Sequence, residues 1–304
     1  MDLTQSQLLS LTPSTRFSRR GVIAGGLSAG FAIAVQAVAA TTITTDTKGL
    51  DARDVRIPVA DGTLPGFRAM PETGGPFPMI VVVNEVFGVH AHVQDVCVRL
   101  AKLGYFATAP ELFAREGDVN TMTDLQTILD TVTAKTPDSQ VATDIDSTIA
   151  WARTTKKADI DRLGITGFCW GGRQVWLYAA RNPALKAGVA WYGGPLVGWT
   201  PANAGNPAIR QWDREYRPKD PIDVVADLKA PVLGLYGGAD PGIPVASVES
   251  MREALKAAGK TAEIIVYPDT PHAFHSDYRP SYREEPAKDG WQRMLEWFKR
   301  YGVA

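Results

Sequence analysis

The sequence predicts one α/β domain built on a doubly wound, mostly parallel sheet, and three observations indicate it. Strand-like segments alternate with segments of helical periodicity along the chain, which is typical of parallel crossover units. The continuous apolar run at 78–85 is typical of a strand covered on both faces. An antiparallel hairpin comes first, because Asp61 and Gly62 form a strong turn signal within 54–70. We expect helices on both faces of this sheet.

The remaining elements continue this alternation. In 93–104, apolar residues recur at spacings of three and four, and Cys97 lies on their stripe, so we interpret it as a core residue. Further strands are expected in 105–110, 162–168, 186–193, 230–240 and 261–270, and further helices in 139–155, 171–182, 244–260 and 287–302. No repeat or linker divides residues 54–304, so they are interpreted as a single domain.

Composition narrows the classes of function. The chain has 304 residues, of which 45% are hydrophobic and 21% are charged, and its formal net charge is -1. That charge gives no field to attract nucleic acid or an anionic membrane, so a small molecule is the expected partner. Two cysteines are too few for a disulfide framework.

The N-terminus has the pattern of an export signal. Arg19 and Arg20 precede an Ala- and Gly-rich apolar segment that ends in Ala37-x-Ala39, which indicates a twin-arginine signal at residues 1–39. We expect the twin-arginine export machinery as a partner, a periplasmic location and no stable membrane association after cleavage. An uncleaved signal anchor is the alternative, which the Ala and Gly content disfavours. A polar leader is expected at 40–53.

The segment 164–176 places one cysteine between two glycines, where a predicted strand meets a predicted helix. Gly167 and Gly171 leave the space that a tight strand-to-helix turn needs around a strained nucleophile. The turn would lift the sulfur of Cys169 toward a substrate and next to a helix N-terminus, which favours a thiolate and can hold an oxyanion. A small buried cysteine is also a normal packing choice, and this alternative stays open.

Two further polar residues follow later strands, at the sheet edge where ligand sites form in such folds. Asp240 lies in a Gly- and Pro-rich loop after one strand, and His272 lies in a loop after the next. With Cys169 they give the chain order nucleophile, acid, histidine, which is that of the α/β-hydrolases. In this hypothesis the histidine moves protons, while the aspartate fixes its tautomer and steadies its cation.

These assignments have competitors. Asp240 could instead bond its own loop backbone, and Asp269 and Asp277 compete for the acid role. His275 competes with His272, which is preferred because it comes directly after the turn.

A metal site is not expected. The histidines occur as the pairs His90-x-His92 and His272-x-x-His275, but no Cys or carboxylate beside them has the spacing of a recognisable site. We therefore expect no metal ion and no cofactor.

Several stretches taken together resemble the dienelactone hydrolase family, the cysteine branch of the α/β-hydrolases. They are VVVNEVFGVH, APELFAR, GITGFCWGG, AWYGG, LYGGADPGIP and YPDTPHAFH, within residues 54–301. The resemblance implies an α/β-hydrolase fold and the triad Cys169, Asp240 and His272, which would cleave a small ester or lactone through an acyl thioester.

The resemblance also implies roles around this triad. Glu85 matches an acid that controls thiol ionisation: the resting thiol is protonated, and substrate binding shifts the glutamate so that it accepts the proton. The backbone N–H groups of Val86 and Trp170 match the oxyanion hole, and Arg115 matches an arginine that binds the substrate carboxylate. The alternatives are that Glu85 is a buried structural partner of an arginine and that Arg115 is an ordinary surface residue.

One position departs from the family pattern. Ser276 stands where dienelactone-specific members carry a second carboxylate-binding arginine, and Arg279 is nearby but out of register. The departure argues against dienelactone itself and leaves ester or lactone hydrolysis intact. The charged segment 203–221 is unusually long, and we expect a lid or pocket edge there.

The sequence is compatible with three functions. A hydrolase is preferred, and a non-catalytic periplasmic protein that binds a small acid in the same pocket is the alternative. A redox thiol protein is disfavoured because the chain has no Cys-x-x-Cys motif. We expect a monomer.

Overall fold

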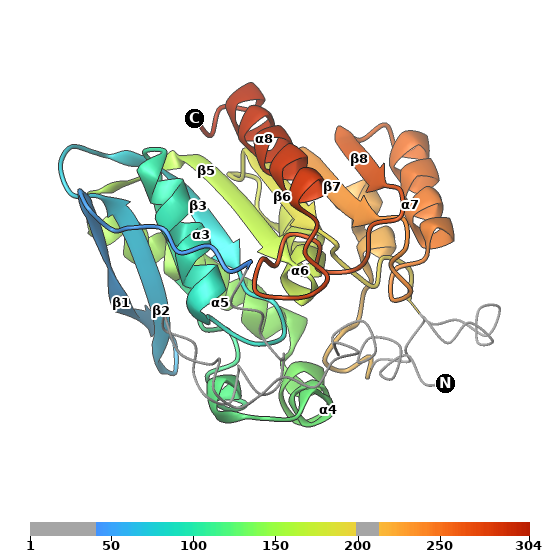
Figure 1. The fold of residues 1–304 in the computed structure, drawn as a ribbon, viewed down its shortest axis with the longest axis horizontal. Helices are drawn as coiled ribbons and strands as arrows, with labels where there is room; N and C mark the ends of the chain where they lie inside the picture. The colour runs from blue at the N-terminus through green and yellow to red at the C-terminus, as the bar shows by residue number, and fades with distance from the viewer. Residues whose placement is uncertain (1–40, 199–212) are drawn as a thin grey trace.

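The computed structural model describes residues 41–198 and 213–304, which form one sheet between two layers of helices (Figure 1). The predicted signal at 1–39 lies outside the described residues. The predicted fold class is confirmed: the structure has an α/β-hydrolase fold, with a mixed, mostly parallel sheet that opens with an antiparallel pair.

Eight strands of the described residues form the sheet, in the order β1-β2-β4-β3-β5-β6-β7-β8. The strands are β1 (Leu50–Val59), β2 (Gly62–Pro71), β3 (Phe77–Val83), β4 (Phe106–Pro110), β5 (Ala158–Phe168), β6 (Ala187–Trp191), β7 (Val232–Gly237) and β8 (Ala262–Tyr267). β2 pairs antiparallel with both β1 and β4, and the remaining pairs are parallel. The carboxyl ends of the parallel strands therefore meet at one edge.

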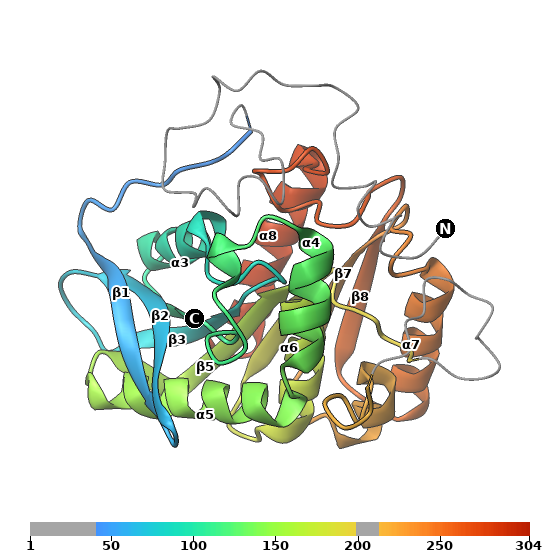
Figure 2. The same ribbon diagram turned by 90° about the horizontal axis from the view of Figure 1, so that it is seen from below.

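Helices cover both faces of the sheet, as the alternating pattern predicts. The helices are α3 (Ala91–Lys102), α4 (Leu125–Thr127), α5 (Asp138–Thr154), α6 (Trp170–Arg181), α7 (Val245–Ala257) and α8 (Glu284–Arg300). Figures 1 and 2 show α3 and α8 over one face and α5 and α6 over the other. Short helical turns between 119 and 135, which the sequence pattern did not predict, join β4 to α5.

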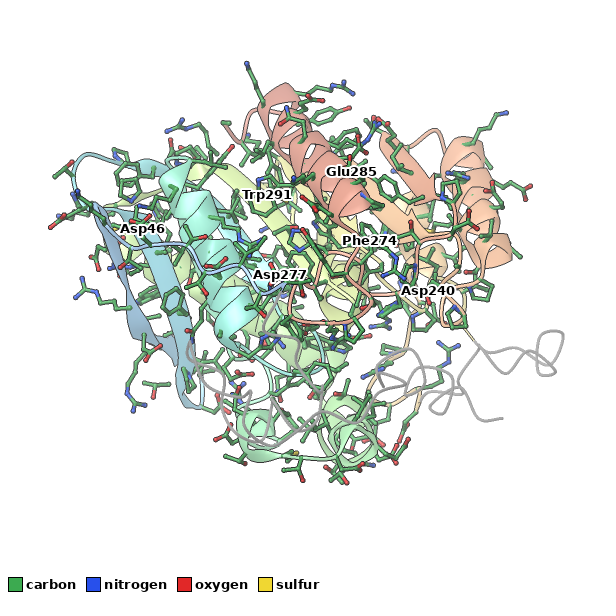
Figure 3. The ribbon with its side chains drawn as sticks, in the orientation of Figure 1. Asp46, Asp240, Phe274, Asp277, Glu285 and Trp291 are labelled. Atoms are coloured by element: carbon green, nitrogen blue, oxygen red, sulfur yellow. The ribbon has the colours of Figure 1, made fainter. Side chains whose placement is uncertain are left out.

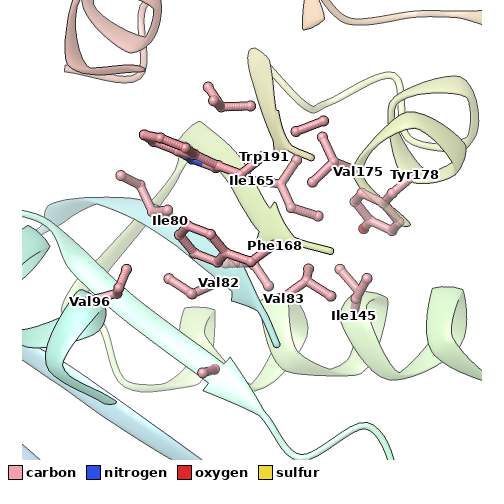
Figure 4. Close-up of a cluster of buried hydrophobic side chains, with 14 of the residues drawn as sticks. Ile80, Val82, Val83, Val96, Ile145, Ile165, Phe168, Val175, Tyr178 and Trp191 are labelled. Atoms are coloured by element: carbon pink, nitrogen blue, oxygen red, sulfur yellow. The ribbon is translucent and has the colours of Figure 1, made fainter. Parts of the chain in front are cut away.

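The core lies on both sides of the central strands. Val82 and Val83 of β3 are fully buried, in agreement with the continuous apolar run. Figure 4 shows them with Phe168 at the end of β5, between Val96 of α3 and Ile145 of α5. Burial of each such side chain contributes about 1.5–3 kcal/mol, so this core holds the strand ends, and the loops that follow them, at fixed positions.

The expected polar leader is partly wrong. β1 begins at Leu50 and pairs with β2 from its first residue, so the expected boundary at residue 54 falls inside a strand. Farther upstream, the N–H of Thr45 donates to Asp95 at 2.6 Å and the N–H of Ile43 donates to Asp277 at 3.3 Å. Buried carboxylates thus accept hydrogen bonds from the backbone of residues 43 and 45, a long-range effect that local composition does not reveal.

The described end of the long insertion is tied to the body of the protein. Arg217 is buried and donates to the carbonyl of Thr133, and Arg173 of α6 donates to the carbonyl of Lys219 at 2.7 Å. Residues 203–212, which make up most of the expected lid, lie outside the described residues. No helix within 41–198 or 213–304 has the length and apolar character needed to span a membrane.

Candidate active site

The strand-to-helix turn at Cys169 is as tight as its glycines predict. β5 ends at Phe168 and α6 begins at Trp170, so Cys169 forms the whole connection, with φ 55° and ψ -118°. A Cβ on Gly167 would lie 2.4 Å from the carbonyl oxygen of Gly171, and a Cβ on Gly171 would lie 2.4 Å from that of Val83. The predicted need for glycine is confirmed, and the left-handed φ of a non-glycine residue marks a strained position.

Asp240 and His272 come together at the same edge of the sheet. Asp240 follows β7 and His272 follows β8, and Oδ2 of the aspartate is 2.6 Å from Nδ1 of the histidine. The other carboxylate oxygen accepts the backbone N–H of Gly242 at 2.8 Å and of Ile243 at 3.2 Å. The competing loop-capping role is therefore present too, and it orients the carboxylate toward the imidazole.

The electrostatics of His272 connect it to the sulfur. Burial by itself would lower the pKa of His272, but the neighbouring Asp240 and Cys169 outweigh burial and raise that pKa well above its usual value. A side-chain hydrogen bond with Cys169 is also among the causes of this shift. Because Nδ1 is engaged by Asp240, Nε2 is the ring nitrogen that remains for other partners.

The competing acid and base residues lie in other environments. Asp277 contacts Arg99 at 2.6 Å and His92 at 3.4 Å, and Figure 3 shows it on the α3 side of the molecule, whereas Asp240 is on the α7 side. The ring of His275 is 4.5 Å from that of Trp191, and burial lowers the pKa of His275 well below its usual value. His275 is thus a neutral core residue in this structure.

Glu85 is buried in a polar cage just beyond β3. Its Oε1 lies 3.1 Å from Nε2 of His90 and accepts the hydroxyl of Tyr278, while its Oε2 lies 3.6 Å from Nη2 of Arg279. Burial would raise the pKa of Glu85, but Arg279 and His90 lower it overall, so the carboxyl is ionised. The arginine partner of the structural alternative is therefore present.

The two backbone N–H groups assigned to an oxyanion hole begin neighbouring segments. Val86 follows Glu85 in the loop after β3, and Trp170 is the first residue of α6, where an N–H has no acceptor within its own helix. β3 and β5 are adjacent in the sheet, with Val83 paired to Gly167. Their carboxyl ends, and the segments that start there, are therefore neighbours.

Arg115, which was expected to anchor a substrate carboxylate, has carboxylate partners within the protein, and the anchoring role stays a prediction. Its Nε donates to Asp61 at 2.7 Å and its Nη1 donates to Asp144 at 2.7 Å, and Nη2 bonds both carboxylates. All three guanidinium nitrogens are thus engaged within the protein. Arg115 joins the tip of the β1–β2 hairpin to α5, a long-range partnership that the local motif could not reveal.

Several residues of the site were missed or undervalued in the sequence. Arg279 is buried beside Glu85, and Cys169 is among the groups that raise its pKa. Tyr192, just beyond β6, has its ring 5.0 Å from that of His272 and its hydroxyl 3.2 Å from Oγ of Ser276. The position of Tyr192 after a strand was a usable signal, whereas Arg279 lies too far along its loop to be placed by strand position.

Comparison with known proteins agrees with this geometry. The model of the dienelactone hydrolase family matches residues 64–302. The chain belongs to the dienelactone hydrolase family. It is therefore a hydrolase with the α/β-hydrolase fold.

Family relatives resemble the chain over most of its length. A Methylorubrum extorquens protein named "Putative carboxymethylenebutenolidase" is 60% identical over the full length of both chains. An Escherichia coli K12 protein of the same name is 52% identical, with 90% of this chain and 96% of that protein covered. A Klebsiella pneumoniae crystal structure titled "Putative Dienelactone Hydrolase" has a TM-score of 0.76 and 50% identity, with 83% of this chain and 99% of that one covered.

Proposed function

We propose that this dienelactone hydrolase family member cleaves a small ester or lactone, with Cys169 as nucleophile, His272 as proton carrier and Asp240 as the residue that orients the histidine. The observation that carries the proposal is the buried Asp240–His272 pair at 2.6 Å, with Cys169 among the groups that hydrogen-bond His272 and raise its pKa. Cys169 stands at the strained turn and is among the groups that act on His272. The name of the relatives, carboxymethylenebutenolidase, agrees with a lactone substrate.

The proposed reaction has two halves. The thiolate of Cys169 attacks the carbonyl carbon, and the N–H groups of Val86 and Trp170 hold the oxyanion that forms. Collapse of this intermediate breaks the C–O bond, and the leaving oxygen takes a proton from His272. Water, deprotonated by the now neutral His272, then attacks the acyl thioester. The C–S bond breaks, the acid is released, and the sulfur recovers its proton from Glu85.

Glu85 supplies the first proton transfer in this proposal. A carboxylate close to a thiolate opposes its formation, so an ionised Glu85 must accept the thiol proton or move away. Arg279 holds the charge of Glu85 in the resting structure. A substrate carboxylate that binds Arg279 would weaken the contact between Arg279 and Glu85. The pKa of Glu85 would then rise while the thiol is in position for attack.

Arg279 replaces Arg115 as the proposed contact for a substrate carboxylate. Its guanidinium is buried, its Nε has no hydrogen-bond partner within the described residues, and Cys169 is among the groups that shift its pKa. A guanidinium suits this task because it can bind a carboxylate with two donors.

Replacement of each cysteine tests the reaction. In Cys169→Ala, turnover of an aryl ester should fall by at least about 10³-fold, since loss of a nucleophile commonly costs that much or more. Cys97→Ala is the matched control and should retain turnover within about twofold. Retained turnover in Cys169→Ala would rule out the thiol mechanism.

The anion contact is tested with paired substrates, a lactone that bears a carboxylate and its neutral analogue. Arg279→Met should remove the preference for the anionic lactone, a loss of about 10- to 100-fold, because a hydrogen bond to a charged group is worth about 1.5–3 kcal/mol. Arg115→Gln is the control and should leave the preference unchanged. The reverse pattern would return the anchoring role to Arg115.

We also propose export by the twin-arginine route, with a periplasmic mature protein. The support is the arginine pair, the apolar segment and Ala37-x-Ala39 in the sequence. Fractionation of cells with and without a working twin-arginine pathway tests this, and replacement of Arg19 and Arg20 by lysine should keep the full-length chain in the cytoplasm. Export of that variant would contradict the proposal.

A further inference from the structure

A helix cap fixes the tautomer of the histidine beside Glu85. His90 is the N-cap of α3, and its Nδ1 accepts the backbone N–H of His92 at 3.3 Å. A nitrogen that accepts a hydrogen bond carries no proton, so the proton of the neutral ring lies on Nε2. Nε2 is 3.1 Å from Oε1 of Glu85 and therefore donates to it.

The ring of His90 remains neutral while it does so. The side chains of His90 and Glu85 are each only 1% exposed. Burial lowers the pKa of His90 to about 4, in spite of the carboxylate beside it. At neutral pH, His90 therefore gives Glu85 a directed hydrogen bond without adding a charge.

The two oxygens of Glu85 are consequently unlike. Oε1 accepts from both His90 and the hydroxyl of Tyr278. Oε2 has no hydrogen-bond partner within the described residues, and its nearest charge is Arg279 at 3.6 Å. The lone pairs that remain for a proton are therefore mainly on Oε2.

We infer that His90 is a positioning residue, which holds Oε1 of Glu85 and so presents Oε2 as the oxygen that takes the proton of Cys169. In this step the S–H bond breaks, an O–H bond forms at Oε2, and the sulfur keeps the electron pair with which it attacks. The inference rests on the proposed function, because the role of Glu85 is part of it.

The surroundings of Glu85 allow the effect of His90 to be separated from the effect of the other groups that face this carboxylate. The titratable groups that face Glu85 are His90 and His92 at α3, Tyr192 after β6, and His275, Tyr278 and Arg279 after β8. Arg279 is the permanent cation among them. Replacement of His90 leaves that cation in place, so a change in proton transfer would come from the lost donor.

Two substitutions separate the role of His90 as a helix cap from its hydrogen bond to Glu85. Asparagine is a good N-cap and keeps an acceptor for the N–H of His92, but its side chain is too short to reach Glu85. Glutamine is long enough to donate to Glu85 and is a poor cap. His90→Asn therefore tests the hydrogen bond to Glu85, and His90→Gln is its rescue.

The first measurement is the pH profile of kcat, which reports on the enzyme–substrate complex. Loss of a donor to the charged carboxylate raises its pKa, so His90→Asn should move the acid limb about one unit to higher pH. Because Oε1 is no longer held and Oε2 is no longer directed at Cys169, kcat should also fall about tenfold, with KM within about twofold. His90→Gln should restore the profile. An unchanged profile in His90→Asn, or equal losses in both variants together with a lower melting temperature, would overturn the inference.

The second measurement does not need turnover. Iodoacetate carries a carboxylate that can bind Arg279. The rate at which it alkylates Cys169 reports the population of the thiolate directly. His90→Asn should slow this alkylation about tenfold, and His90→Gln should recover most of the rate. If the wild type lacks ester turnover but alkylation is slowed in His90→Asn and recovered in His90→Gln, the proposed function fails and the role of His90 stands. If alkylation does not change in this way, the role of His90 fails.

Discussion

The two cysteines of this protein lie in opposite environments. Cys97 is in the middle of α3, is fully buried, and packs within the apolar core. Burial, together with the charge of Asp95, raises the pKa of the Cys97 thiol far above its usual range. Cys169 is partly exposed and stands at the first turn of α6, with His272 among the groups around it.

The difference shows that backbone position decides what a thiol does. A cysteine in a helix interior points into the surface that the helix buries, and there it acts as a small hydrophobic side chain. A cysteine at a strand-to-helix junction stands beyond the sheet edge, next to N–H groups that have no partner in the helix. The following predictions test this contrast, from the largest expected effect to the smallest.

The largest difference is expected between Asp240, which contacts His272, and Asp95, which acts on Cys97. Asp240→Asn should lower kcat/KM about 10³- to 10⁴-fold, because an amide no longer fixes the tautomer of His272 or steadies its cation. Loss of the negative charge also lowers the pKa of His272, so the acid limb of the remaining activity should move to lower pH. Asp95→Asn, near Cys97, should retain turnover. Equal losses in the two variants would contradict the contrast.

Alkylation rates compare the thiols directly. Iodoacetamide at pH 8 should label Cys169 at least about 100-fold faster than Cys97, because only an accessible thiolate reacts. Peptide mass spectrometry at timed intervals measures both rates in one sample. Labelling at similar rates would show that the turn does not activate its cysteine.

The glycines should show what the Cys169 turn requires. Within an ordinary helix, replacement of glycine by alanine stabilises the protein by about 0.4–1 kcal/mol. Gly171→Ala should instead destabilise it by about 2 kcal/mol or more, because the new Cβ meets the carbonyl oxygen of Val83. Denaturant unfolding measures the difference. Ala101→Gly in α3 is the reference and should cost about 1 kcal/mol; a stabilised Gly171→Ala would mean that the turn relaxes easily.

The smallest expected effect is at Cys97. Cys97→Ser places a hydroxyl among apolar side chains and should cost about 1–3 kcal/mol of unfolding free energy. Turnover per folded molecule should not change. Loss of turnover without loss of stability would show that Cys97 takes part in the reaction.

Local pattern was sufficient for most of the architecture. The apolar run at 78–85, the three- and four-residue spacing around Cys97 and the turn at Asp61 and Gly62 each reflect a rule that acts over a few residues. The elements found there begin and end within a few residues of the expected bounds. The short helical turns after β4 have no such periodicity, and the pattern missed them.

Long-range partners account for what the local pattern did not reveal. Arg115 belongs to a family motif, but Asp61 and Asp144 engage its guanidinium from distant parts of the chain. Arg279 was out of register in the sequence and is nevertheless beside Glu85 in the structure. A partner chosen by three-dimensional approach leaves no spacing signature.

The sequence alone determined the alternation of strands and helices, the turn at Cys169 and the order of Cys169, Asp240 and His272, because periodicity and glycine sterics act locally. Only the tertiary structure decided which arginine faces Glu85, which tautomer His90 adopts and why residues 41–45 bind the folded domain. Each of these depends on a hydrogen bond or ion pair between buried groups, whose energy is realised only when packing has removed water and brought the partners together.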